Sequence, residues 1–129
     1  MKTLLAMICV TLIALIASPV HAGSKDPSPV IFVTNPDNTV DVYGSLGGAH
    51  NSPDSMQQIG CNYVYQLGGT PYVYCYATDA NGRFGSCTTN STAIFAMNSD
   101  SLIHFGWNSL GQCRVLEIRN SSQWPSKQQ

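Results

Sequence analysis

The stretch CNYVYQLGGTPYVYCYATDANGRFGSC, Cys61 to Cys87, decides the fold of this chain. It holds three short runs rich in β-branched and aromatic residues, which favour strands. Two turn segments, Gln66–Thr70 and Asp79–Arg83, separate the runs, and each places a glycine where a left-handed residue is required. If both turns are three-residue loops, Cys61 lies opposite Cys75, and Cys75 lies opposite Cys87. A two-residue turn at Gly68-Gly69 would instead shift the first of these registers by one residue and reverse the faces. The stretch therefore predicts three antiparallel strands with a cysteine on each.

A hairpin is predicted upstream. Val30–Thr34 is a β-branched and aromatic run, and the turn Asn35–Thr39 places Asn38 where a left-handed conformation completes a bulged hairpin. This turn pairs Phe32 with Val42.

The segment Ser45–Gln58 has no clean period and is expected to be the longest loop. Long ordered loops often carry function, so His50 and Asn51 within it are candidate ligand-binding residues. A plain solvated connection is the alternative, and the loop-length pattern favours it.

A second hairpin is predicted near the end of the chain. Residues 101–107 alternate between two largely apolar faces, and a glycine-closed turn at 108–112 leads to a return strand. The expected pairs are Trp107 with Cys113, Phe105 with Val115, and His104 with Leu116. Apolar neighbours favour a packed His104 over a catalytic or metal-binding one.

Together these segments predict an all-β protein, mainly an antiparallel meander of about seven short strands, with one short helix and disulfides. The helix is expected over residues 93–97, where Asn90-Ser91-Thr92 can cap one or two turns. Residues 23–129 are enough for a single domain and not for two.

The first 22 residues have the three-part form of a secretory signal peptide. Lys2 supplies the positive charge, an uncharged apolar run follows, and Val20-His21-Ala22 offers a cleavage site. The apolar run is shorter than the roughly 20 residues of a spanning helix, so no stable membrane anchor is expected. The pattern predicts an exported protein, periplasmic or secreted.

The predicted mature chain is mildly acidic. Loss of Lys2 lowers the count of Lys plus Arg from 6 to 5, against 7 Asp plus Glu, for a net charge of −2. No basic face is expected for nucleic acid. No G-x-S-x-G sequence occurs, and His104 has no metal-ligand partner at a suitable spacing. The sequence predicts no cofactor and no metal, and it favours a non-enzymatic protein over a small hydrolase.

An even set of cysteines remains after removal of the signal, and in a small exported domain this predicts two disulfides. Their gaps of 14, 12 and 26 residues do not suit a zinc site. The middle cysteine has two opposite neighbours and can bond only one, which leaves two connectivities. These are Cys61–Cys75 with Cys87–Cys113, or Cys75–Cys87 with Cys61–Cys113. The first is slightly favoured, because both of its bonds join neighbouring segments.

Tyrosine is the densest chemical feature. Tyr72, Tyr74 and Tyr76 share one face of their strand whatever the turn register. A tyrosine combines a broad apolar plate with a polar tip, which suits binding to sugars or proteins. The alternative is that these rings are packed, since sheets favour aromatic residues in any case.

A longer pattern spans the second half of the chain. It comprises Cys75-x-Ala77-x-Asp79-x-x-Gly82, Ser86-Cys87, Asp100-Ser101-x-Ile103-x-Phe105-x-Trp107, Gly111-x-Cys113 and Asn120-Ser121-Ser122. This pattern resembles that of a group of small exported bacterial proteins without an assigned activity. The resemblance implies export and a compact disulfide-bonded β fold, and it carries over no catalytic residue.

These features predict a small exported binding or interaction module with a protein or carbohydrate partner. Its contact surface would be the tyrosine strand or the Ser45–Gln58 loop. The alternative function is an inhibitor or accessory subunit of a secreted or envelope hydrolase.

Overall fold

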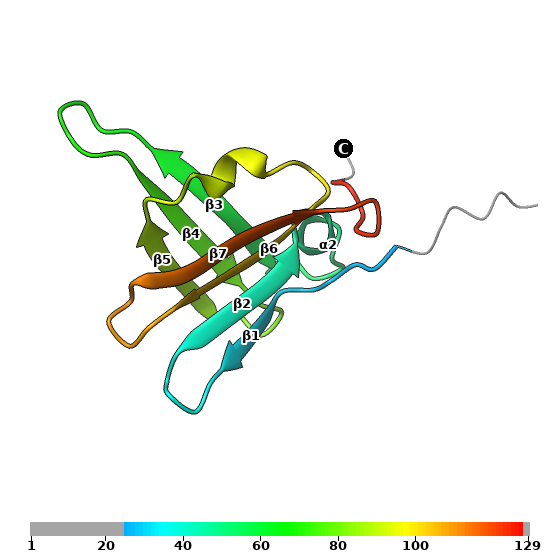
Figure 1. Ribbon diagram of the computed structural model, residues 1–129. Coiled ribbons are helices and arrows are strands. Elements are labelled where there is room, and N and C mark those ends of the chain that lie inside the picture. The colour runs from blue at the N-terminus through cyan, green and yellow to red at the C-terminus, as the bar shows by residue number, and fades with distance from the viewer. Residues whose placement is uncertain (1–24, 128–129) are drawn as a thin grey trace, which may run out of the picture.

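A computed structural model of the chain describes residues 25–127, so the predicted export signal lies outside the described residues. Seven strands form two antiparallel sheets that lie in two layers (Figure 1). The predicted all-β class and strand number are confirmed. The strands are β1 (Ile31–Thr34), β2 (Val40–Ser45), β3 (Gln58–Val64), β4 (Tyr72–Thr78), β5 (Phe84–Thr89), β6 (Ser101–Trp107) and β7 (Cys113–Asn120).

The two sheets differ in how local their pairings are. β3, β4 and β5 form a three-stranded meander. The β4–β5 turn has the predicted geometry, with the Asp79 N–H bonded to the Arg83 carbonyl oxygen. The predicted three-residue loop between β3 and β4 is wrong, because residues 65–71 form a longer connection there. The four-stranded sheet has the order β1-β2-β6-β7. In it β2 pairs with β6, which follows the whole meander in the sequence. The residues of a turn specify only the pairing of the two strands that the turn joins. The pairing of β2 with β6 therefore depends on tertiary packing.

The core lies between the layers. Along β6, Ile103 and Phe105 are fully buried, and Val42 of β2 lies beside them. Along β4, every second residue points to the same interior, as the two-residue period of a strand requires. The other main core residues are Val30, Leu46, Ala49, Ile59, Val73, Ala77 and Ile94, together with three of the cysteines.

Most predicted registers are confirmed. Phe32 pairs with Val42, and Asn38 has the expected positive φ of 61°. Cys75 pairs with both Cys61 and Cys87.

The predicted register of the last hairpin is wrong beyond its first pair. Trp107 pairs with Cys113 as expected, but a β-bulge then shifts β7 by one residue. Phe105 consequently pairs with Leu116, and His104 pairs with Glu117. A bulge opposes two residues to one and can re-aim a side chain, and no turn motif announces it.

The predicted loop Ser45–Gln58 begins with a short helix, α2 (Leu46–His50), whose first four residues are buried. The side chain of Ser45 caps it by accepting a hydrogen bond of 2.9 Å from the Gly48 N–H. Glycine is required at positions 47 and 48 because other backbone segments approach α2 closely there. A Cβ on Gly48 would lie 1.4 Å from the carbonyl oxygen of Pro27, and one on Gly47 would lie 1.7 Å from that of Pro125.

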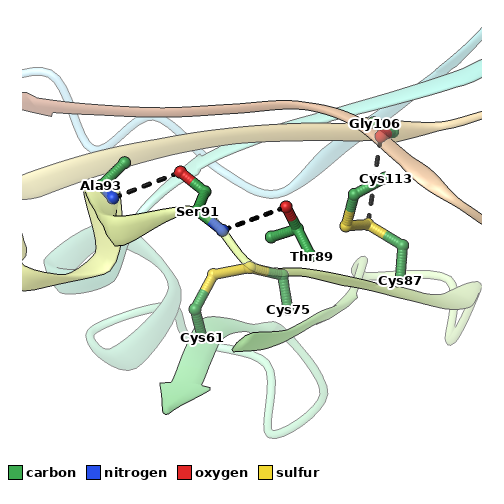
Figure 2. Close-up of a disulfide and its surroundings, with 8 residues drawn as sticks. All are labelled: Cys61, Cys75, Cys87, Thr89, Ser91, Ala93, Gly106 and Cys113. Atoms are coloured by element: carbon green, nitrogen blue, oxygen red, sulfur yellow. Dashed lines mark hydrogen bonds between the residues drawn. A yellow bond between two sulfur atoms is a disulfide. The ribbon is translucent and has the colours of Figure 1, made fainter. Parts of the chain in front are cut away.

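The predicted helix after β5 is the 3-10 helix η1 (Thr92–Ala96). Its cap is Ser91, whose Oγ accepts from the Ala93 N–H at 3.2 Å (Figure 2). The helix contributes Ile94 to the core.

Both predicted disulfides form, and the favoured connectivity is confirmed. Cys61–Cys75 joins adjacent strands of the three-stranded sheet, whereas Cys87–Cys113 joins β5 to β7 across the two layers (Figure 2). The sulfur of Cys87 lies 3.9 Å from the carbonyl oxygen of Gly106. A disulfide sulfur carries no hydrogen, so this approach is a packing contact.

Candidate functional site

The three predicted tyrosines lie on the side of β4 that faces away from the core. Tyr72, Tyr74 and Tyr76 are each half-buried and alternate with fully buried residues. Tyr74 and Tyr76 stack with ring centroids 5.9 Å apart and planes 22° apart. The rings are therefore ordered by one another while part of each stays in contact with solvent.

The neighbouring strands give Tyr74 and Tyr76 polar or very small neighbours, whereas Tyr72 pairs with Val64. Tyr74 lies between Asn62 of β3 and Thr88 of β5 in the ladder, and Tyr76 lies between Gly60 and Ser86. A Cβ on Gly60 would come within 3.3 Å of the Tyr76 hydroxyl, so this ring crosses the glycine. We call the surface formed by Tyr72, Tyr74, Tyr76, Asn62, Ser86 and Thr88 the tyrosine face.

A hollow of about 630 Å³ opens at the Tyr72 end of the tyrosine face. Its lining combines aromatic rings with hydroxyl and amide groups: Thr70, Pro71, Tyr72, Tyr74, Thr88, Thr89 and Asn90. This volume lies in the range of small-molecule sites. The hollow offers apolar plates together with groups that donate and accept hydrogen bonds.

The other two predicted site residues, His50 and Asn51, line two different hollows. His50, at the end of α2, lines a smaller hollow of about 220 Å³ together with Tyr76 and Lys127. Asn51 instead lines a hollow beside Pro27 and Pro125, and its side chain donates to the Ser126 carbonyl oxygen at 3.0 Å. The structure thus joins His50 to one end of the tyrosine face and places Asn51 outside it.

A charged cluster that was not predicted from the sequence lies on the outer side of the four-stranded sheet. His104 lies between two carboxylates, with Nε2 3.1 Å from Oδ1 of Asp41 and Nδ1 3.4 Å from Oε2 of Glu117. The ring of Tyr43 stacks on the imidazole at a centroid distance of 4.2 Å. The expectation of apolar neighbours for His104 is wrong, because the bulge in β7 replaces Leu116 by Glu117 at the paired position.

Two arginines complete this charged cluster. Arg114, the extra residue of the bulge, forms an ion pair with the second oxygen of Asp41, which also accepts from Asn35 at 2.7 Å. Arg119 forms an ion pair with Glu117 at 2.7 Å. The whole group comprises Asp41, His104, Arg114, Glu117 and Arg119.

The contacts lower the pKa of both carboxyl groups. Burial by itself raises the pKa of Asp41, but hydrogen bonds from His104 and Asn35 and the charge of Arg114 outweigh it, so the net direction is downward. The hydrogen bond from Arg119 is the main cause that lowers the pKa of Glu117, and His104 adds to it. Both nitrogens of His104 are engaged by carboxylates, which leaves neither directed at a substrate. We therefore interpret the charged cluster as a clamp between β2, β6 and β7.

Within residues 25–127, no three His, Cys, Asp or Glu side chains are grouped so that they could hold a metal ion. In the same part of the chain, no helix is long and apolar enough to cross a membrane.

The fold and the site define a small two-sheet β protein with two disulfides and an aromatic, uncharged outer face on its smaller sheet. The disulfides suit an oxidising environment outside the cytosol. Comparison with known proteins finds no matching family model, no matching curated protein and no matching solved structure.

Proposed function

We propose that this protein is an exported, non-enzymatic binding module, periplasmic or secreted, whose contact surface is the tyrosine face. The observation that carries the proposal is the position of the three β4 tyrosines. They lie outside the core, partly exposed, beside a hollow of small-molecule size. Tyrosine provides large contact area at low cost in conformational entropy, since it has only two side-chain torsions.

The alternative explanation, that the three tyrosines serve only to pack the sheet, accounts for fewer of these observations. The core is already filled from the opposite side of β4 by Val73, Cys75 and Ala77. Strand propensity favours aromatic residues at such positions, but it does not account for a hollow lined by hydroxyl and amide groups beside three outward rings. A binding surface explains both.

The alternative function, an inhibitor or accessory subunit acting through an exposed loop, has less support from the longest predicted loop, Ser45–Gln58. Leu46–Ala49 of that segment is buried in α2, and the Asp54 side chain ties down the remainder through the backbone N–H groups of Met56 and Gln57. The segment offers less exposed chain than a long loop would.

A direct test compares retention of envelope or culture-fluid components on three immobilised forms of the chain. These are the wild type, a Tyr72→Ala/Tyr74→Ala variant, and a Tyr43→Ala control, which removes the same side chain from the other sheet. We expect a component that the wild type and the control retain and the double variant loses. Retention that survives the double variant, or chemical conversion of the retained component, would contradict the proposal.

A further inference from the structure

We infer that the ligand of the tyrosine face is an uncharged oligosaccharide, bound in the hollow between Tyr72, Tyr74 and Thr88. This inference rests on the proposed binding function and adds the chemical class of the ligand. Three observations carry the inference. They are the distribution of charge between the sheets, the chemistry of the hollow, and the row of three β4 tyrosines, of which Tyr74 and Tyr76 stack.

Charge is divided sharply between the two sheets. Of the strand residues that the structure describes, every charged one lies on the four-stranded sheet, on β2 or β7. The outward positions of β3, β4 and β5 hold only uncharged residues: Gln58, Gly60, Asn62, Val64, Tyr72, Tyr74, Tyr76, Thr78, Phe84, Ser86 and Thr88. An anionic ligand is normally met by Arg or Lys. These uncharged strand positions fit a ligand without charge, and Lys127 lies only beside the far end, at Tyr76.

The hollow matches the chemistry of a sugar. Thr70, Thr88 and Asn90 present hydroxyl and amide groups that can both donate and accept hydrogen bonds, as each hydroxyl of a sugar also does. Tyr72 and Tyr74 add apolar plates for the C–H face of a pyranose ring, and their phenol groups can bond at the rim. Ligand sites of this size typically pair apolar walls with a few placed polar groups.

The stacked row indicates an extended ligand. Tyr72 and Tyr76 are four residues apart on one strand, a distance of roughly 13 Å at the usual strand rise. The Tyr74–Tyr76 stack continues from the hollow toward the smaller hollow at His50 and Lys127. A chain of several sugar units could contact the whole row, so affinity should rise with oligosaccharide length.

A protein partner fits the surface less well. Stable protein interfaces cover about 800 Å² per partner and depend on aromatic and arginine anchors near their centre. The tyrosine face has no arginine. The most exposed apolar side chain nearby, Leu67 at 96% exposure, lies at the tip of the β3–β4 hairpin, which projects beyond the sheet (Figure 1). A protein partner would be expected to use that tip.

The experiment is titration calorimetry on the purified, oxidised chain. The uncharged probes are hexasaccharides of glucose with β-1,4, β-1,3 or α-1,4 links, and of N-acetylglucosamine. The anionic probes are oligogalacturonate and heparin fragments of equal length. We expect at least one uncharged probe to bind, more tightly than its trisaccharide, with a dissociation constant that hardly changes between about 0.05 and 0.5 M salt.

Variants locate the site. Tyr74→Ala should weaken binding of that probe by about tenfold or more, as loss of a central aromatic anchor does. Thr88→Val, which replaces a hydroxyl by a methyl group, should weaken it severalfold. Tyr43→Ala and Leu67→Ala should leave it unchanged, and circular dichroism should confirm that each variant is folded.

The outcomes separate the two proposals. Tyr74-dependent binding of an anionic probe alone would overturn the oligosaccharide inference and leave the binding module standing. Failure of all uncharged probes to bind also overturns the inference. Binding of any probe that Tyr74→Ala does not affect would overturn both the inference and the tyrosine face as contact surface.

Discussion

Cys87 on β5 is bonded to Cys113 on β7, and this bond links the two sheets covalently. The other bond, Cys61–Cys75, lies within one sheet. The protein therefore has one disulfide that holds its layers together and one that reinforces a hairpin.

Loss of either disulfide should cost about 3 kcal/mol of unfolding free energy, chiefly by enlarging the unfolded ensemble. The Cys87→Ala/Cys113→Ala variant should lose slightly more than Cys61→Ala/Cys75→Ala, because its bond closes the longer loop, 26 against 14 residues. Urea unfolding of both variants measures the difference. A Cys75–Cys87 peptide in a non-reducing digest would contradict this connectivity.

Gly48→Ala should destabilise the protein by about 2 kcal/mol or more, because the new methyl group would overlap the backbone of Pro27. Helix propensity acts in the opposite direction and favours alanine by about 1 kcal/mol, so a loss isolates the backbone contact. Gly69→Ala is the matched control, since its Cβ would meet nothing closer than 3.4 Å. The control should change stability by no more than about 0.5 kcal/mol. Equal urea midpoints for the two variants would show that the backbone of Pro27 does not pack on α2 at Gly48.

Acid should weaken the fold partly through the charged cluster. Because the folded-state pKa values of Asp41 and Glu117 are lowered, their stabilising contribution is fully present above the unfolded values, near 4, and is lost as pH falls through the lower folded values. Asp37 and Asp54, whose pKa values are also lowered, contribute in the same direction.

The Asp41→Asn variant separates the contribution of Asp41 to acid sensitivity from those of the other carboxyl groups. It should be less stable than the wild type at neutral pH, and the difference should shrink as pH falls below the unfolded pKa of the carboxyl group, near 4. Urea midpoints measured from about pH 7 to pH 2 give both curves. A difference that stays constant across this range would mean that the charge of Asp41 contributes nothing.

Tyr74→Ala should cost only about 1–2 kcal/mol, because the ring is half-buried and leaves no closed cavity. Phe105→Ala is the comparison in the core and should cost about 3–5 kcal/mol. If urea unfolding gave Tyr74→Ala a loss as large as that of Phe105→Ala, the tyrosine face would be a packed surface.

Export predicts a processed N-terminus. Edman sequencing of the protein recovered from the periplasm or the medium should begin at Gly23 or within a few residues of it, because Val20-His21-Ala22 has the form of a cleavage site. Protein that keeps Met1 and sediments with membranes would contradict the prediction.

The sequence by itself determines what depends on neighbouring residues. The left-handed residues Asn38, Gly82 and Gly111 specify their turns, and each adopts the expected positive φ. Strand alternation places the three β4 tyrosines on one face, and the length of the β4–β5 turn sets Cys75 opposite Cys87. These predictions succeed because a turn and a two-residue period involve only a few consecutive residues.

Only the tertiary structure decides the contacts between distant segments. Asp41 meets His104 from 63 positions away, and a single bulge residue, Arg114, gives the histidine Glu117 in place of Leu116. α2 forms where no periodic signal exists, since the backbone of Pro27 and Pro125 encloses its glycines. Cys87 bonds Cys113, and not Cys75, once packing of the sheets brings β7 over β5. Each of these outcomes is set by the packing of two surfaces, and no local pattern in either segment encodes it.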